Sequence, residues 1–239
     1  MATQSTPAAE PQGSFGGDLV GMFNFYIDPQ ASAKLITHKL FWIGPVIVVA
    51  IVMLVTGVMS MPVVERVLTN LPPPPNVPPD QFQRQMEIGL IVQKVIVYLS
   101  PIVLIIMDAI FAGILMGSSA VAQVKTRFLW LFNLMAGLGL ISMLEFIART
   151  AVIHLKTDIS TLAELQPPLG LDIFIPEGAN RFLTAFVGFF SVFQIWSLVM
   201  MVLIYSAAFK VSKGKALGVI SPLIILGLLF KLLSAMGQR

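Results

Sequence analysis

Five stretches of this chain are long, apolar and nearly free of charge, and they constrain the fold more than any other feature. A helix that crosses the hydrocarbon core of a bilayer needs about 20 apolar residues, because each residue adds about 1.5 Å along the axis. The sequence therefore predicts an all-α fold, a polytopic membrane protein built as a bundle of five transmembrane helices. The expected spans lie at about 40–64, 95–117, 128–148, 182–209 and 217–236.

The composition supports this class of protein. Only 11% of the residues are charged, whereas soluble domains carry about 25%, and the mean hydropathy is +0.88. The net charge of +3 does not indicate a nucleic-acid partner, because basic residues beside membrane spans record orientation. The absence of cysteine excludes disulfides, thiol chemistry and cysteine-based metal sites. We expect the lipid bilayer to be the main partner.

The N-terminal stretch has a different character from the rest. Residues 1–17 are rich in Ala, Pro, Gln, Ser and Gly and have neither a basic start nor an apolar core. This pattern argues against a signal peptide and predicts a disordered lead over residues 1–24. The remainder, 25–239, is then one five-span membrane domain.

Amphipathic helices are expected to flank the first two spans. Asp28 followed by Pro29 predicts a helix start, because Asp caps and Pro suits the first turn. The segment after it, 30–40, is interpreted either as an amphipathic helix on the membrane surface or as a solvated lead-in. A second amphipathic segment, 81–94, leads into the second span.

The distribution of basic residues indicates the orientation. Five spans put the two termini on opposite sides of the membrane, and the counts of Lys and Arg on the two sides, seven and eight, do not decide between them. The two short loops on the N-terminal side, 125–127 and 210–215, together hold five basic residues, and short loops dominate the positive-inside rule. We therefore expect a multi-pass protein of the inner (cytoplasmic) membrane with its N-terminus in the cytoplasm and its C-terminus outside.

Polar side chains inside the expected spans are the candidate functional residues. Asp108 lies in the middle of the second span, where a carboxylate costs about 2.5–3.5 kcal/mol. Small residues repeat every fourth position beside it, at Ala109, Gly113 and Gly117, which predicts a close-packing helix face. The candidate intramembrane polar residues are Asp108, Asn133, Glu145, Arg149 and Gln194.

Two interpretations of these polar residues stay open. Glu145 and Arg149 are four residues apart, which predicts an ion pair along one helix. If the polar faces line one interior, Asp108 and Glu145 form a proton- or ion-coupled pathway. If they do not, the same residues are polar contacts that hold helices together.

The loop between the last two expected spans is a compact basic turn. Its candidate contacts with lipid headgroups are Lys210, Lys213 and Lys215. The turn is not a phosphate loop, because Phe209 stands where the first glycine is needed and Ala216 replaces Ser or Thr. His38 and His154, the only histidines, belong to no metalloprotease motif. We expect no catalytic residue, no metal site and no cofactor.

Two motifs near the C-terminus carry a family resemblance, FQIWSLV at 193–199 and SKGKA at 212–216. Together with the Asp28–Pro29 start and the order of five spans, they make the chain resemble the prokaryotic branch of the Yip family, which is named for interaction with Rab-type GTPases. The resemblance covers about residue 25 to the C-terminus and implies five spans and a cytoplasmic N-terminus. The chain lacks the long acidic domain of eukaryotic relatives, so their role in vesicle traffic is not carried over.

Two functions remain as hypotheses. The first is a membrane protein without catalytic activity that acts by association, either with a partner membrane complex or as a homo-oligomer, or that organises the membrane. The alternative is an ion- or proton-coupled solute permease that uses Asp108 and Glu145.

Overall fold

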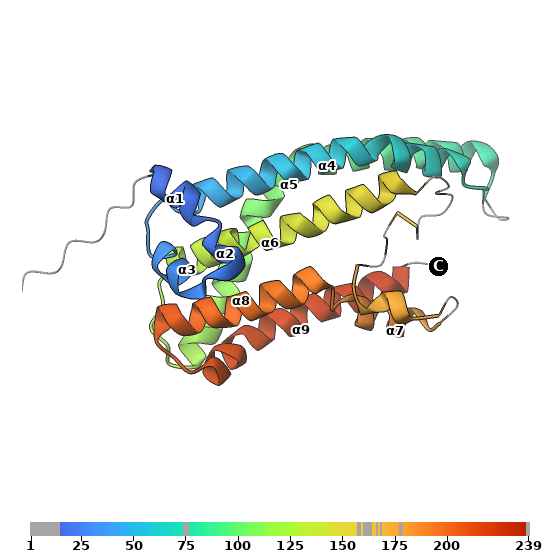
Figure 1. Cartoon of the computed structure of the whole chain (residues 1–239). Coiled ribbons are helices and arrows are strands. Elements are labelled where there is room, and N and C mark those ends of the chain that lie inside the picture. Colours follow the sequence, from blue (N-terminus) through green and yellow to red (C-terminus); the bar gives the residue numbers. More distant parts are fainter. Residues whose placement is uncertain are drawn as a thin grey trace, which may run out of the picture.

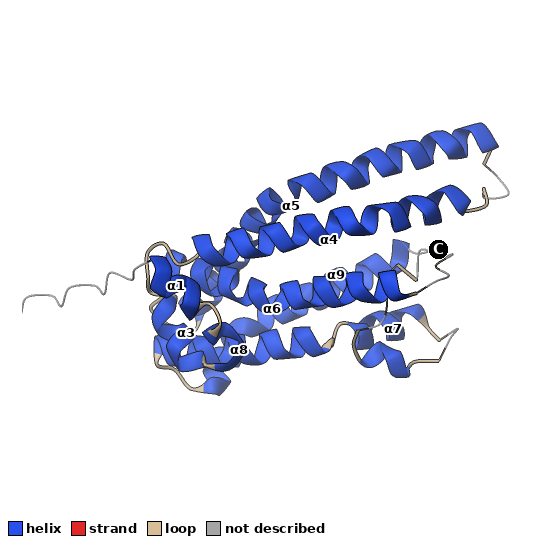
Figure 2. Ribbon diagram, turned by 45° about the horizontal axis from the view of Figure 1, so that its top comes forward, coloured by secondary structure: helices blue, strands red, loops and turns tan. Residues whose placement is uncertain are grey.

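The structure, a computed structural model, describes residues 15–73, 77–156, 159, 164–165, 167, 169–176 and 179–237. Every regular element in these ranges is a helix apart from one isolated bridge between Gly170 and Ser191, as Figure 2 shows. The all-α prediction is confirmed. The elements are α1 (Phe15–Gly21), α2 (Asn24–Ile27), α3 (Pro29–Leu35), α4 (Ile43–Asn70), α5 (Pro79–Val121), α6 (Phe128–Leu155), the 3₁₀ helix η1 (Leu171–Phe174), α7 (Arg181–Gly188), α8 (Val192–Phe209) and α9 (Lys213–Gly237).

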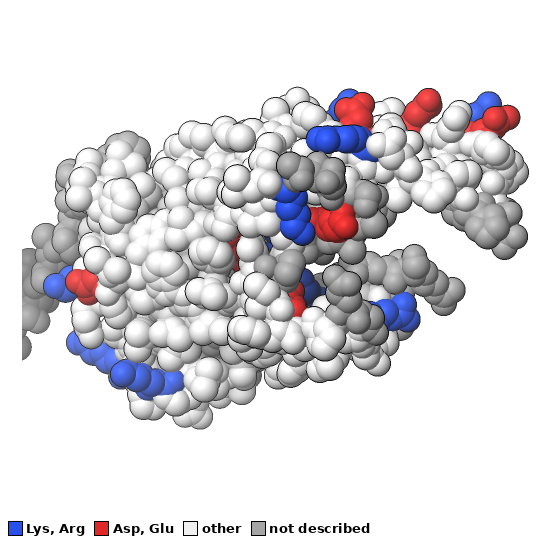
Figure 3. Space-filling view, turned by 45° about the vertical axis from the view of Figure 1, so that its right-hand side comes forward, with Lys and Arg blue, Asp and Glu red and all other residues white. Residues whose placement is uncertain are grey.

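Five of these helices, α4, α5, α6, α8 and α9, are long and apolar enough to cross a membrane. The flank of the bundle is free of charge in the space-filling view, and the charged side chains gather toward its ends (Figure 3). By helix length and hydropathy the protein is therefore a multi-pass membrane protein, as the five charge-poor stretches predict.

Helix α6 lies at the centre of the bundle and packs against α2, α4, α5 and α8. Within its most apolar window 56% of the residues are buried, compared with 17% in α4, α5 and α9. The outer helices instead expose large apolar side chains along their length. In a membrane protein lipid covers such faces, because the acyl chains are as apolar as the side chains.

The fourth expected span is not one helix. The stretch 182–209 breaks at Phe189–Ser191, so that α7 and α8 are separate and the spanning helix begins at Val192. Ser191 begins α8 by accepting a hydrogen bond from the backbone N–H of Gln194 at 3.0 Å, and it also forms the bridge to Gly170. A side chain at Gly170 would lie 2.9 Å from the carbonyl oxygen of Phe190, so the close approach at the break requires glycine.

The last span begins earlier than expected. Helix α9 starts at Lys213, so the basic turn is shorter and two of its lysines lie in the first turn of the helix. Helix α8 ends at Phe209 and is followed by its C-cap Lys210, whose φ of 52° is left-handed. Glycine is the usual residue in that conformation.

The N-terminal region is more ordered than its composition indicates. Residues 1–14 lie outside the described residues, but the end of the expected disordered lead forms α1 and the beginning of α2. Asp28 caps α3 as predicted, accepting hydrogen bonds from the N–H groups of Gln30 and Ala31 at 2.9 Å each. Helix α3 ends at Leu35 and packs against α8 at one end of the bundle, as Figure 1 shows, and its position at the membrane surface stays a prediction.

Helix α5 contains 43 residues, which corresponds to a length of about 65 Å. The expected amphipathic lead at 81–94 and the second span are therefore one continuous helix. With α4 it forms a hairpin that diverges from the other helices toward its tip (Figures 1 and 2). The hydrocarbon core is only about 30 Å thick, so much of this hairpin extends beyond it.

Two Ser-Pro steps interrupt the backbone hydrogen bonds of the long helices. Proline lacks an N–H group and cannot bond the carbonyl four residues earlier. At Pro101 the hydroxyl of Ser100 donates to the freed carbonyl of Val97 at 2.7 Å. At Pro222 the hydroxyl of Ser221 donates to Gly218 in the same way at 2.8 Å. Each serine thus satisfies the acceptor that its proline leaves open.

Candidate functional site

A polar cluster joins α6 to the start of α8. Arg149 donates to Glu145 Oε1 at 3.2 Å, which confirms the expected ion pair along the helix. The hydroxyl of Ser191 donates to Glu145 Oε2, also at 3.2 Å. Because Ser191 is the cap of α8, the carboxylate lies at the positive end of that helix dipole. The side chain of Glu145 therefore has two partners, Arg149 on its own helix and Ser191 at the start of α8.

This cluster borders a cleft of about 320 Å³ that opens between α6, α9 and the break before α8. Both carboxylate and ammonium side chains line it, and Figure 3 shows acidic and basic side chains around a hollow at this end of the molecule. Gln194 also lies in the lining, so the structure brings two of the candidate polar residues together there. The lining residues are Glu145, Gly188, Phe189, Ser191, Gln194, Gly227, Phe230, Lys231 and Ser234.

By helix length, the cleft lies about one hydrocarbon thickness from the starts of α6 and α9. At 1.5 Å per residue, Glu145 is about 26 Å along α6 from Phe128 and Lys231 is about 27 Å along α9 from Lys213. Both helices start at the opposite end of the bundle (Figure 1). A hydrocarbon core of about 30 Å that begins at these starts therefore ends close to the cleft.

Asp108 lies away from the cleft. It is buried in α5, with 6% of its surface exposed, and its Oδ2 has no hydrogen-bond partner in the described part of the chain. It is not part of the cleft lining, and no hydrogen bond joins it to Glu145 or Asn133 among the described residues. Of the candidate polar residues, Glu145 and Gln194 line the cleft, whereas Asp108 and Asn133 do not.

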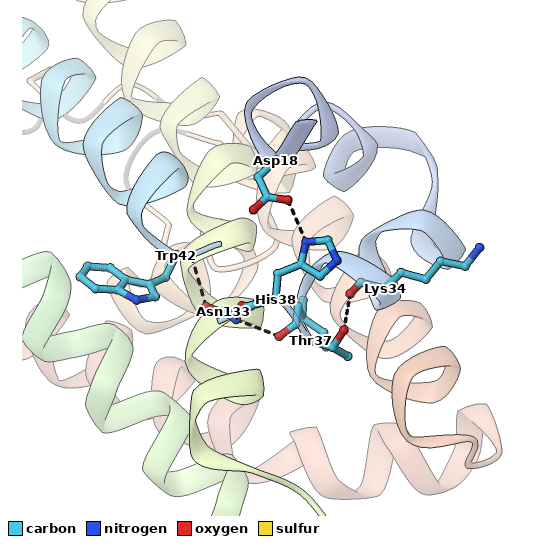
Figure 4. A network of polar contacts seen from close by, with 7 residues as sticks. Asp18, Lys34, Thr37, His38, Trp42 and Asn133 are labelled. Carbon is cyan, nitrogen blue, oxygen red and sulfur yellow. Dashed lines mark hydrogen bonds and ion pairs between the residues drawn. The ribbon is translucent and has the colours of Figure 1, made fainter. Parts of the chain in front are cut away.

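Asn133 has a structural role at the opposite end. Its side chain is fully buried, and Nδ2 donates to the carbonyls of Ile36 and His38 at 2.8 and 2.7 Å. Its Oδ1 accepts from the backbone N–H of Trp42 at 3.2 Å. Figure 4 shows this amide holding the turn between α3 and α4. Asn133 therefore fixes the chain that leads into the first span.

The same turn is tied to α1. His38 Nδ1 lies 2.8 Å from Asp18 Oδ1, also visible in Figure 4. Neither residue stands out in the sequence as a partner of the other, because Asp18 falls within the expected disordered lead and is 20 residues from His38. Only the position of α1 against α3 reveals the contact.

The basic residues near the start of α9 are exposed, as headgroup contacts require. Lys210, Lys213 and Lys215 all lie on the surface, at the end of the bundle that also carries α1–α3 (Figure 1). Contact with headgroups stays a prediction.

The small residues of α5 divide into two groups. Ala112 is buried in the core and Ala109 packs against it, whereas no atom of the described residues lies within 4 Å of the place where a side chain at Gly113 or Gly117 would begin. The same is true of Gly214 and Gly218 on α9, a helix that neighbours α5. The expected close-packing face therefore exists at Ala109, but Gly113 and Gly117 face open space within the single chain.

Some polar contacts of the structure are not predictable from the sequence. Ser119 and Tyr205 share a hydrogen bond of 2.7 Å in the buried core, although they lie on different helices. Lys231 also lines the cleft, but its place near the end of the fifth expected span indicates only a lysine that extends toward headgroups. Ser234 follows three residues later, on the same side of a helix, and this shared side is the sequence feature that relates the two lining residues.

The chain was compared with protein-family models, curated proteins and solved structures. No match was found. Among the described residues, no group of three or more His, Asp or Glu side chains is placed to hold a metal ion. The site must therefore be interpreted from its own chemistry, which is that of a charged cleft at a membrane boundary.

Proposed function

We propose that this membrane protein acts by association with a partner membrane protein and has no catalytic activity of its own. The observation that carries the proposal is the α4–α5 hairpin. Measured from Val121, Ile96 lies about 38 Å along α5 and Ile88 about 50 Å. Both are therefore beyond a hydrocarbon core of about 30 Å that begins at that end of the helix.

Apolar side chains remain exposed on this protruding part of α5. Ile88, Ile91 and Ile96 are 61%, 61% and 54% exposed. Exposed apolar patches outside the hydrocarbon mark sites of interaction. The glycine pairs of α5 and α9 support the same proposal, because glycines spaced by four residues allow a helix of another chain to approach closely.

Photo-crosslinking in the native membrane tests the proposal. A photoreactive amino acid at Ile91 should yield a protein–protein adduct of defined mass. The control position is Leu229, which is 50% exposed on α9 within the expected hydrocarbon region and should yield mainly lipid adducts. Equal protein adducts from both positions, or none from Ile91, would contradict the proposal.

A second candidate function, a proton- or ion-coupled solute permease, is favoured by the break before α8. Discontinuous helices whose N-termini carry polar groups are typical of secondary transporters. Here the break lies beside Glu145, and Asp108 is buried nearer the middle of the bundle. In proteoliposomes, a flux driven by a proton gradient that is lost in Asp108→Asn would support this function. The absence of any flux would eliminate it.

We further propose an inner-membrane location with a cytoplasmic N-terminus. In support, the end of the bundle that carries α1–α3 also carries the short basic loops at 125–127 and 210–215. A Yip-type membrane protein would have this topology, and the resemblance at 193–199 and 212–216 is retained as part of the proposal. Alkaline phosphatase fused after Arg239 should be active, and an inactive, stable fusion would contradict the orientation.

A further inference from the structure

We propose that the cleft before α8 binds the headgroup of a phospholipid that carries both a phosphate and a primary ammonium, as in phosphatidylethanolamine. The inference is independent of the association function and concerns a different face of the protein. It rests on the charges of the lining, the position of the cleft and the apolar surface beside it.

The cleft presents one carboxylate and one ammonium to a ligand. Lys231 forms no ion pair among the described residues, so its three N–H donors are available to a phosphate. Glu145 accepts one hydrogen bond on each oxygen, and a carboxylate has about four acceptor positions. It can therefore accept an ammonium in addition to Arg149 and Ser191. Opposite charges in one cleft of about 320 Å³ match a small zwitterion.

The surroundings indicate a lipid as the source of that zwitterion. The cleft lies at the depth where headgroups meet the hydrocarbon, as the lengths of α6 and α9 place it. Phe189 and Phe230 form its apolar walls, and a side chain at Gly227 would approach Phe189 to 3.1 Å. Leu229, Phe230 and Leu233 are exposed along α9, which gives acyl chains an apolar surface next to the headgroup site.

The chemistry also distinguishes between headgroups. A choline headgroup has no N–H to donate to Glu145, so it loses the hydrogen-bonded part of the ion pair. A glycerol headgroup has no ammonium to donate to the remaining acceptor positions of Glu145, so only its phosphate can bind, at Lys231. A headgroup with a phosphate and a primary ammonium satisfies both sides of the cleft.

Lipid binding by the purified full-length protein tests the proposal. Native mass spectrometry in detergent would compare phosphatidylethanolamine, phosphatidylcholine and phosphatidylglycerol with identical acyl chains at equal concentration. We expect a preference of about tenfold for phosphatidylethanolamine, equivalent to about 1.4 kcal/mol. Equal binding of the three lipids, or a preference for either of the others, would overturn the proposal.

A competition experiment with a water-soluble headgroup compound tests whether the ligand is a whole lipid or a free headgroup. Glycerophosphoethanolamine at millimolar concentration should compete weakly or not at all, because it lacks the acyl chains that contact α9. Strong competition by this compound together with no retained lipid would assign the cleft to a soluble ligand and overturn the lipid proposal.

Matched variants locate the binding. Lys231→Gln and Glu145→Gln should each abolish the preference, whereas Lys231→Arg should keep it. Lys156→Gln and Glu87→Gln remove the same charges outside the cleft and should bind as the wild type does. Gly227→Leu fills the cleft without changing charge and should also abolish binding, which provides a further test if a charge variant unfolds. Wild-type preference in Lys231→Gln and Gly227→Leu proteins that remain monodisperse would overturn the assignment.

Discussion

The indole Nε1 of Trp196 donates a hydrogen bond of 3.0 Å to the backbone carbonyl of Tyr26. The two rings also pack together, with centroids 5.8 Å apart. The hydroxyl of Tyr26 in turn donates to the carbonyl of Leu140 at 3.0 Å, and burial raises the pKa of Tyr26, which keeps this donor protonated. One residue of the N-terminal segment thus connects α6 to α8.

Removing either hydrogen bond should weaken the bundle. Trp196→Phe and Tyr26→Phe should each lower the free energy of unfolding by about 1 kcal/mol, the net value of one hydrogen bond. Tyr26→Phe keeps the backbone carbonyl that Trp196 uses, so the two effects should add. Thermal unfolding in detergent of both single variants and the double variant measures this. If the effect of the double variant differs from the sum of the two single effects by well over 0.5 kcal/mol, the two hydrogen bonds depend on each other.

Asn133 should be among the least replaceable polar residues of the chain. Asn133→Ala removes three hydrogen bonds and leaves two buried carbonyls without this donor, so we expect a loss of about 3 kcal/mol. Lys34 and Lys39 are already exposed, and the loosened turn between α3 and α4 should let trypsin cleave the backbone after them faster. Ser118→Ala, on a nearby helix end, removes only a hydroxyl bonded within its own helix and is the control. An unchanged proteolysis pattern in Asn133→Ala would contradict the role of this amide.

Glycines of the bundle should respond oppositely to the same substitution. The ring of Phe25 occupies the place where a Cβ at Gly137 would lie, so Gly137→Ala should destabilise by about 2 kcal/mol. Gly113 faces open space, and Gly113→Ala should stabilise the isolated chain by about 0.5–1 kcal/mol, because alanine favours the helix. Denaturation in detergent compares the two. Equal effects would mean that Phe25 moves aside at little cost.

The serine before Pro222 should matter only because of the proline. Ser221→Ala leaves the carbonyl of Gly218 without a donor inside the hydrocarbon, at a cost of about 1 kcal/mol. In a Pro222→Ala background the backbone N–H returns, so the same serine substitution should have almost no effect. Ser100→Ala beside Pro101 should cost less, because that step lies near the membrane boundary. A double-mutant cycle of Ser221→Ala and Pro222→Ala, measured by unfolding in detergent, gives these free energies. If Ser221→Ala destabilises the protein as much without Pro222 as with it, the serine does not compensate for the proline.

Local features of the fold are readable from the sequence. Uninterrupted apolar stretches predict the five long helices, because only length and the absence of charge are needed. The capping of α3 by Asp28 and the pair of Glu145 with Arg149 also follow from spacing, since their partners lie within one helical turn.

Contacts between distant segments are not readable in this way. The apolar stretch at 182–209 continues through the break, and the cap at Ser191 and its bridge to Gly170 arise only when the two segments meet. Asn133 looks like part of an intramembrane polar face, but its partners come from the turn before α4. The cleft likewise depends on Glu145 and Lys231, which lie on two helices far apart in the chain and become neighbours only in the folded bundle.

The packing of α2 also has a consequence for biogenesis. Phe25 lies against Gly137 on α6 and Tyr26 is bound by Trp196 on α8, yet both aromatic residues leave the ribosome long before those helices. The N-terminal segment must therefore wait at the membrane surface until α8 has been inserted, and only then can it dock. Synthesis of the fourth spanning helix, rather than of the first, is therefore the step that lets this segment complete its packing.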